Sequence, residues 1–353
     1  MRRTQEEATL KNQRLASALA LGGVAAAALG TWRGRSRYSF EDRVVLITGG
    51  SRGLGLEMAR VLAGEGAAIA LFSRDEAELA RAADELRSRA IDVQTIRGDV
   101  ASRGDAERAV AEVVRRYGGI DVLINNAGII QVGPARHMTV EDYESALDVH
   151  LRGPLYTMLA AIPHMRRQGF GRIVNISSIG GKIPVPHLAP YVASKFALTG
   201  LSSTLHAELA RDNIIVTTVA PGLMRTGSPI NAMMKGRHER EFAWFAAGDA
   251  LPGLSIDSTR AARQIVEGCR RGRAELILTP PARLAAALYG LMPDTFVRIE
   301  SLVNVLLPSA TGPEGDRAKL GRDSTSAAAP SVLTTLGDRA AARNNELPRP
   351  SHA

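Results

Sequence analysis

The chain has 353 residues, of which 45% are hydrophobic and 23% are charged; this globular balance predicts one large buried core and excludes disorder over the bulk of the chain. The formal net charge is +8, yet the basic residues are scattered and aromatic residues make up only 4%, so we expect no nucleic-acid partner. Cys269 is the single cysteine; this excludes an internal disulfide, and no Cys/His cluster has zinc-site spacing, so no metal is expected.

Residues 1–39 form a basic segment around an apolar one. The run 15–32 has no charged residue, and as a helix it would span about 27 Å, close to the roughly 30 Å of bilayer hydrocarbon. Its many alanines and glycines leave three alternatives: a single membrane anchor, a soluble or surface-lying helix, and a cleaved signal. We favour the anchor and expect membrane association through residues 15–32.

From residue 40 onward, short β-branched runs alternate with helical stretches, a pattern typical of βαβ units. The predicted strands are residues 43–48, 67–73, 92–97, 120–124, 172–177, 214–219 and 275–278. Seven such strands predict a single α/β domain over residues 40–282, built on a doubly wound, Rossmann-type parallel sheet.

A glycine-rich turn follows the first predicted strand directly and leads into a helix. It reads Thr48-Gly49-Gly50-Ser51-Arg52-Gly53-Leu54-Gly55. Glycines at 49, 53 and 55 suit a tight turn, close backbone approach to a pyrophosphate, and close packing of helix on strand. The helix N-terminus adds free N–H groups for phosphate. We therefore predict a dinucleotide site that includes Gly49, Ser51, Arg52, Gly53, Leu54 and Gly55.

The end of the second strand indicates which dinucleotide is bound. An acidic residue there would bind the adenosine ribose and repel a 2′-phosphate, but the chain reads Ser73-Arg74. Arg74 and Arg52 could pair with that phosphate through charge-assisted hydrogen bonds. NADP(H) is therefore favoured over NAD(H), with Asp99 and Val100, at the end of the third strand, near the adenine.

Further motifs follow in order, and together they resemble the classical short-chain dehydrogenase/reductase family over residues 40–278. They are Asn125-Asn126-Ala127-Gly128 after the fourth strand, Ser178 thirteen residues before Tyr191, Lys195 four residues after it, and Pro221-Gly222 with Thr226. The resemblance implies that Asn126, Ala127 and Gly128 line the cofactor. It also implies that the Pro-Gly loop lies by the nicotinamide and that the protein is a homodimer or homotetramer.

Tyr191, Lys195 and Ser178 are the predicted catalytic residues. Tyr191 and Lys195 share a helix face at spacing i, i+4, and an ammonium beside a phenol favours the phenolate. We therefore expect a lowered Tyr191 pKa, as a general acid/base at working pH requires. Ser178 would stabilise charge on the substrate oxygen, and both Tyr191 and Lys195 would also contact the cofactor.

One position departs from the family pattern. In the segment Val149-His150-Leu151-Arg152-Gly153, His150 stands where the family commonly has an asparagine that holds a water in the proton relay. Imidazole can hold a water or pass a proton itself. We therefore include His150 among the catalytic residues and expect an altered pH dependence or an impaired relay.

Three segments follow the Pro-Gly loop. Residues 223–254 are expected to form a lid over an apolar substrate, or alternatively a dimer interface, through Met224, Ile230, Met233, Met234, Phe242, Trp244 and Phe245. Residues 283–308 form an apolar helical extension, for which a packed helix is favoured over a dimer or membrane contact. Residues 309–353 lack periodicity and are predicted to be a mobile polar tail.

These patterns predict an NADP(H)-dependent oxidoreductase that acts on a carbonyl or secondary alcohol of an apolar substrate, such as a lipid or steroid-like molecule. The cofactor favours a location on the cytoplasmic face of a membrane. The alternative is a catalytically impaired cofactor-binding sensor or a membrane-tethered scaffold. Intact Ser178, Tyr191 and Lys195 favour the enzyme, whereas His150 keeps the alternative open.

Overall fold

The computed structural model describes residues 38–250, 255–327, 329–330 and 334–347, and Phe40–Ala353 forms one compact unit. The apolar run 15–32, where we predict a membrane anchor, lies outside the described residues. Among the residues that are described, no helix combines the length and the apolar composition needed to cross a bilayer.

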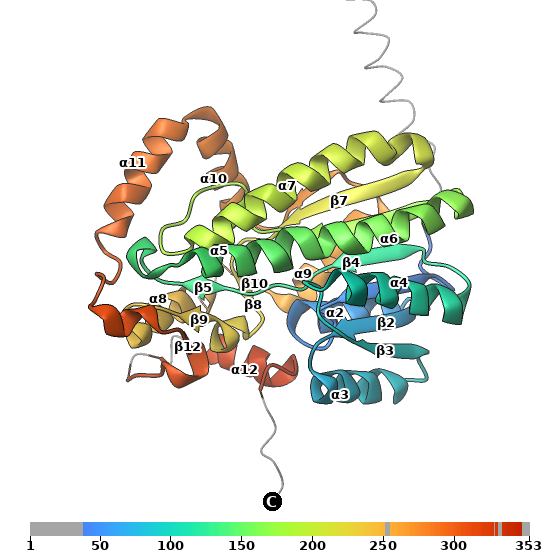
Figure 1. The fold of residues 1–353 in the computed structure, drawn as a ribbon, viewed down its shortest axis with the longest axis horizontal. Helices are drawn as coiled ribbons and strands as arrows, with labels where there is room; N and C mark the ends of the chain where they lie inside the picture. The colour runs from blue at the N-terminus through green and yellow to red at the C-terminus, as the bar shows by residue number, and fades with distance from the viewer. Residues whose placement is uncertain (1–37, 251–254, 328, 331–333, 348–353) are drawn as a thin grey trace, which may run out of the picture. The chain divides into compact units, whose positions relative to one another are not determined.

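A seven-stranded sheet forms the centre of this unit (Figure 1). Its strands are β1 (Val44–Thr48), β2 (Ala68–Ser73), β3 (Val93–Arg97), β4 (Val122–Asn125), β6 (Gly171–Ile176), β7 (Ile214–Ala220) and β11 (Glu275–Ile277). They lie in the order β11-β7-β6-β4-β1-β2-β3, and all neighbouring pairs are parallel. The predicted Rossmann-type sheet is confirmed, with strand ends shifted by one or two residues.

The strand sequences and their register decide where a ligand can enter. β1 and β7 are buried along their whole length, because parallel strands covered on both faces carry apolar side chains on both. Thr48 at the end of β1 pairs with Phe72 in β2 and with Asn125 in β4. The carboxyl ends of these strands therefore meet at one edge, where ligands bind in open α/β sheets.

Helices cover both faces of the sheet. Helices α4 (Arg103–Tyr117), α6 (Gly153–Gln168) and α7 (Ala189–Leu209) cover one face, and α2 (Gly53–Ala63) packs with α9 (Ser258–Arg270) on the other (Figure 1). Phe72, Met158 and Leu209 belong to the larger hydrophobic cluster. Helix α3 (Glu76–Arg87) connects β2 to β3, and α5 (Val140–Leu147) passes through a π-helical turn, η2 (Asp148–Arg152), into α6.

A second group of short elements is built around its own apolar core. It comprises β5 (Gln131–Val132), β8 (Met224–Arg225), η5 (Ser228–Asn231), β9 (Met233–Met234), α8 (His238–Ala250), β10 (Ile256–Asp257) and β12 (Lys319–Leu320). Strands β12, β9 and β5 form a three-stranded sheet. Val132, Met234, Phe242 and Phe245 are buried together at its centre. The described part of the predicted lid, residues 223–250, thus belongs to a small folded layer.

The apolar helical extension differs from our prediction of a packed helix. It forms two helices, α10 (Pro280–Leu291) and α11 (Pro293–Asn304), whose Tyr289 and Phe296 rings meet edge to face at 5.6 Å. Leu302 and Leu306, on the face expected to pack, are 72% and 85% exposed. Pro293 starts a new helix, so the apolar face of α11 turns away from the sheet. The packed-helix prediction is therefore wrong. The two alternatives given for this segment, a dimer contact and a membrane contact, stay predictions.

The prediction of a mobile tail over residues 309–353 is also wrong for the residues described there. They form η6 (Pro313–Asp316), β12, η7 (Gly321–Asp323) and α12 (Thr335–Arg343). His137 binds Asp316 at 2.7 Å, and Asn344 is completely buried. Long-range polar contacts hold this segment, and they leave no periodic trace in its sequence.

Candidate active site

The turn after β1 has the geometry of a phosphate cradle. Gly53 has a φ of +57°, and a Cβ added to Gly55 would lie 2.2 Å from the Gly49 carbonyl oxygen. Helix α2 could therefore not lie this close to β1 with a side chain at position 55. The first turn of α2, from Gly53 to Leu56, carries no charged side chain, so its N–H groups and the positive end of the helix dipole favour an anion.

The Asn-Asn-Ala-Gly segment ties this turn to the sheet. Thr48 Oγ1 accepts hydrogen bonds from the N–H groups of Asn126 and Ala127 at 3.0 and 3.1 Å, and Asn126 Nδ2 donates to the Gly49 carbonyl at 3.1 Å. Asn125 Nδ2 donates to Asn175 Oδ1 on β6 at 2.9 Å. The segment thus holds the turn in place and leaves Ala127 and Gly128 facing the ligand side.

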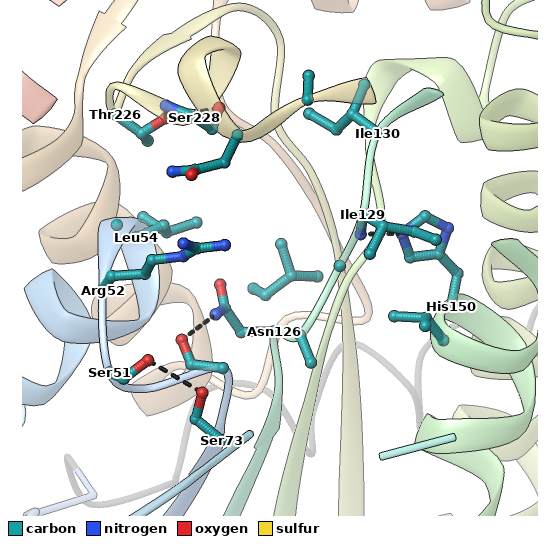
Figure 2. A pocket seen from close by; sticks show the side chains of 18 of the residues that line it. Ser51, Arg52, Leu54, Ser73, Asn126, Ile129, Ile130, His150, Thr226 and Ser228 are labelled. Carbon is teal, nitrogen blue, oxygen red and sulfur yellow. Dashed lines mark hydrogen bonds between the residues drawn. The ribbon is translucent and has the colours of Figure 1, made fainter. Parts of the chain in front are cut away.

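Arg52 points into the cavity beside Ser51 and Ser73 (Figure 2). The two serine hydroxyls lie 3.0 Å apart. Glu78, from α3, accepts hydrogen bonds from Ser51 Oγ and Arg52 Nη1, both at 3.0 Å. We did not predict Glu78 as a site residue. An acidic residue of this kind is expected at the end of β2, and Glu78 lies one helical turn further along, in α3.

Arg74 lies at the rim of the cavity. Its side chain is 66% exposed and pairs with Asp99 at 3.5 Å. Val100 follows Asp99 and lines the cavity. The two arginines expected to hold a 2′-phosphate are therefore both paired with carboxylates, and a phosphate would have to compete with Glu78 and Asp99 for them.

Ser178, Tyr191 and Lys195 lie together on the wall of the same cavity. The N–H of Gly180 donates to Ser178 Oγ at 3.0 Å, which leaves the serine hydroxyl proton for another acceptor. Lys195 Nζ donates to the Ile176 carbonyl at 2.9 Å and lies 5.6 Å from the centre of the Tyr191 ring. Helix α7 and the end of β6 thus bring the three predicted side chains into one group.

The expected lowering of the Tyr191 pKa is not found. Burial raises the pKa of the phenol to about 12, against a smaller lowering by a hydrogen bond with Ser178. Burial also lowers the pKa of Lys195 to about 7. Desolvation is the largest effect at both groups, and it disfavours the charged form of each. At neutral pH Tyr191 is therefore a proton donor.

His150 sits in the π-helical turn η2, a distortion often found at functional sites, and its ring meets Tyr191 edge to face at 5.3 Å. Its Nε2 accepts a hydrogen bond from the Ile129 N–H at 3.1 Å (Figure 2). Nδ1, 2.8 Å from Ser194 Oγ, therefore carries the proton. Burial and the nearby Lys195 hold the pKa of His150 well below its ordinary value. Both ring nitrogens are thus hydrogen-bonded to protein groups, and His150 positions the helix that carries Tyr191. To bind a water molecule, His150 would have to lose one of these two hydrogen bonds.

One cavity of about 680 Å³ unites these residues, a volume that suits a cofactor with a small substrate. All of the predicted site residues line it except Gly55, which lies behind the turn. The wall thus includes Gly49, Ser73, Pro221, Gly222 and Thr226 as well as the catalytic group. The further lining residues that we did not predict include Asp75, Glu78, Asn231, Leu320, Arg322 and Glu346.

The apolar lid residues divide into two sets. Met224 and Met233 line the cavity, beside Ile130 and Leu320. The others lie in the second core or against it: Met234, Phe242 and Phe245 are buried there, and Ile230 and Trp244 pack on them. The prediction that all seven line a substrate pocket is therefore wrong for these five, because the layer needs an apolar core of its own.

The matches to known proteins cover the cavity. The family model of the short chain dehydrogenases matches residues 43–235, which include the glycine turn, Ser178, Tyr191 and Lys195. Dehydrogenase/reductase SDR family member 7B of Danio rerio is 30% identical over 274 residues, 76% of this chain and 84% of that protein. Two crystal structures have a similar fold. L-sorbose reductase from Gluconobacter frateurii, complexed with NADPH and L-sorbose, has a TM-score of 0.62 at 26% identity and covers 69% of this chain and 97% of its own. Actinorhodin polyketide ketoreductase with NADPH has a TM-score of 0.61 at 31% identity and covers 69% and 98%.

Proposed function

The chain belongs to the classical short-chain dehydrogenase/reductase family, and on this premise we propose that it is an NADP(H)-dependent oxidoreductase acting on the carbonyl or secondary alcohol of an apolar substrate. The observation that carries the proposal is the presence of Ser178, Tyr191 and Lys195 in the same cavity as the glycine turn. An uncharged helix start, a positive-φ glycine and a cavity of about 680 Å³ fit a dinucleotide.

The side chains have separable roles in this reaction. When bound, the nicotinamide supplies or accepts the hydride. Ser178, whose oxygen is held by the Gly180 N–H, donates a hydrogen bond from its hydroxyl to the substrate oxygen and orients it. Tyr191, protonated at neutral pH, gives that oxygen its proton during reduction and removes it during oxidation. Lys195, fixed on the Ile176 carbonyl, stabilises the phenolate by its charge.

The preference for NADP(H) over NAD(H) rests on Arg52 and Arg74. Both lie at the end of the cavity next to Ser73, where the adenosine ribose of a dinucleotide would lie in this fold. Two similar structures, those of L-sorbose reductase and actinorhodin polyketide ketoreductase, are complexes with NADPH, which supports the preference. Glu78 and Asp99 oppose it, because each pairs with one of the arginines.

The substrate end of the cavity supports an apolar molecule. Ile129, Ile130, Met224 and Met233 line the cavity, and Ile130 packs in the same apolar cluster as Tyr191, so apolar area would be buried on binding.

The direct test is oxidation of NADPH over a panel of apolar ketones and aldehydes, with Tyr191→Phe as the control. We expect turnover by the wild-type chain that the variant lacks. Binding of NADPH without turnover on any member of the panel would support the alternative, a cofactor-binding sensor or scaffold.

We also propose that residues 15–32 anchor the chain on the cytoplasmic face of a membrane and that the protein is a homodimer or homotetramer. The uncharged run between basic clusters supports the anchor, and the family resemblance supports the oligomer. Fractionation of the full chain beside a chain starting at Tyr38 tests the first. Both chains remaining in the soluble fraction would contradict it. Light scattering of the shorter chain tests the second.

A further inference from the structure

The end of the described chain lies across the mouth of the cofactor cavity. We call residues 343–346 the strap. Arg343 Nη2 donates to Asp257 Oδ2 at 3.1 Å, and Asn344 Nδ2 donates to the Thr226 carbonyl at 3.1 Å. The strap therefore begins against the N-terminus of α9 and the loop that follows the Pro-Gly motif.

The strap then crosses to the glycine turn. The N–H of Gly53, the first residue of α2, donates to the Asn344 carbonyl at 2.9 Å. Asn345 Nδ2 donates to the carbonyls of Ser51 and Glu78 at 2.8 and 3.2 Å. The Gly53 N–H, the donor that would face a diphosphate, is thus bonded to the chain itself.

Glu346 brings a carboxylate to the same place. It is 5% exposed, and its Oε1 would lie 2.6 Å from a Cβ on Gly53. Its Oε2 accepts a hydrogen bond from Asn231 Nδ2 at 2.6 Å and lies 3.4 Å from Arg52 Nε. A carboxylate between a helix N-terminus and an arginine has the chemistry of a bound phosphate group.

Of the contacts that hold the strap, a dinucleotide can replace those at Gly53 and at the Glu346 carboxylate. Diphosphate oxygens can accept from the Gly53 N–H, as the Asn344 carbonyl does, and can take the place of the Glu346 carboxylate beside it, and they carry more charge. Burial raises the pKa of Glu346 to about 7, with Arg52 and Arg322 lowering it and Glu78 raising it. Closing the strap over an ionised carboxylate therefore costs desolvation free energy, which favours its release.

We propose that the strap is an internal competitor for the diphosphate site: Glu346 occupies the position of a cofactor phosphate, and the strap must leave before the dinucleotide binds. The inference rests on the proposed function, because it takes the glycine turn as the diphosphate site. The affinity for the cofactor is then reduced by the fraction of molecules in which the strap is open.

The test uses the full chain with Glu346→Ala, which removes the carboxylate, and Asn345→Ala, which removes the anchor on Ser51 and Glu78. Asp323→Ala is the matched control, because it removes an exposed carboxylate of the same C-terminal segment from outside the cavity. NADPH and NADH binding are measured by fluorescence titration. Amide exchange of residues 48–56 is measured in the same samples without nucleotide.

We expect both strap variants to bind NADPH and NADH about tenfold more tightly than the wild type, with faster exchange at the glycine turn. We expect the control to change neither. Equal affinities in wild type and variants, with turnover intact, would overturn the strap and leave the proposed function standing. A gain for NADPH alone would also overturn it, because Glu346 would then act only on Arg52 and the 2′-phosphate. Faster exchange without binding of either nucleotide in any variant would overturn both proposals.

Discussion

The two sides of the cofactor cavity are built from residues at very different separations along the chain. The glycine turn, with Gly49, Gly53 and Gly55, lies within one βαβ unit, and its shape follows from residues that are neighbours in the chain. The opposite side is assembled from η5, η7 and the strap, which are more than a hundred residues apart at their ends. The local sequence therefore determines the shape of the first side, whereas tertiary packing between distant segments forms the second.

The catalytic group, from the end of β6 and from α7, is like the glycine turn set by residues that are near in the chain, and its loss should have the largest effect. We expect Tyr191→Phe to lower kcat by about a thousandfold, because proton transfer by a positioned side chain contributes roughly 10² to 10⁴. NADPH affinity should stay within about threefold. Steady-state kinetics and a binding titration measure the two quantities. Tyr289→Phe, on α10, is the control, and a similar fall in both variants would contradict the assignment.

The close approach of α2 to β1 provides the next prediction. In Gly55→Ala the new methyl group would meet the Gly49 carbonyl at 2.2 Å, so the helix must move. We expect a loss of about 1–3 kcal/mol in the free energy of unfolding together with weaker NADPH binding. Chemical denaturation measures the first. Gly104→Ala, where a Cβ meets no described heavy atom within 4 Å, should keep wild-type stability, and unchanged stability in both variants would contradict the argument.

Arg52 links the two sides, because it contacts both Glu78 and the strap. We expect Arg52→Ala to lower the ratio of NADPH to NADH affinity about tenfold, the value of one charge-assisted contact to a 2′-phosphate. Parallel titrations with the two nucleotides measure this ratio, and Arg103→Ala on the exposed start of α4 is the control. An equal loss for both nucleotides would place Arg52 at the diphosphate instead.

The smallest expected effect is the pH dependence of NADPH affinity that arises from Glu346 in the strap. The pKa of Glu346 is about 7 in the closed strap and about 4.3 in an exposed glutamate. Closure of the strap takes up a proton on Glu346. The closed strap is therefore most stable below the pKa of the exposed glutamate, and it becomes less stable as the pH rises through the pKa of the closed state. The facing charges are Arg52, Glu78 and Arg322. We expect NADPH affinity to rise several-fold between about pH 4.5 and pH 7, and Glu346→Ala to lack that component; superimposable pH profiles would count against the strap.

Most of the fold and of the site could be predicted because the determinants are short in range. Strand burial, the glycine turn and the Tyr191–Lys195 spacing each involve residues within one element or its neighbour. The pKa of Tyr191 could not be predicted in the same way. Its direction depends on burial by the surrounding layers, which spacing along a helix does not report.

The sequence by itself determined the parallel sheet, the cradle and the catalytic group, since alternating apolar strands, glycines without Cβ atoms and one helical turn impose their geometry locally. Only the tertiary structure decided the partners of Arg52, the exposure of α11 and the path of residues 309–347. Those features depend on hydrogen bonds and ion pairs between distant segments, such as Asn231 with Glu346. Such contacts depend on which surfaces meet after folding, and polar residues in an aperiodic segment look the same whether they meet water or a cavity.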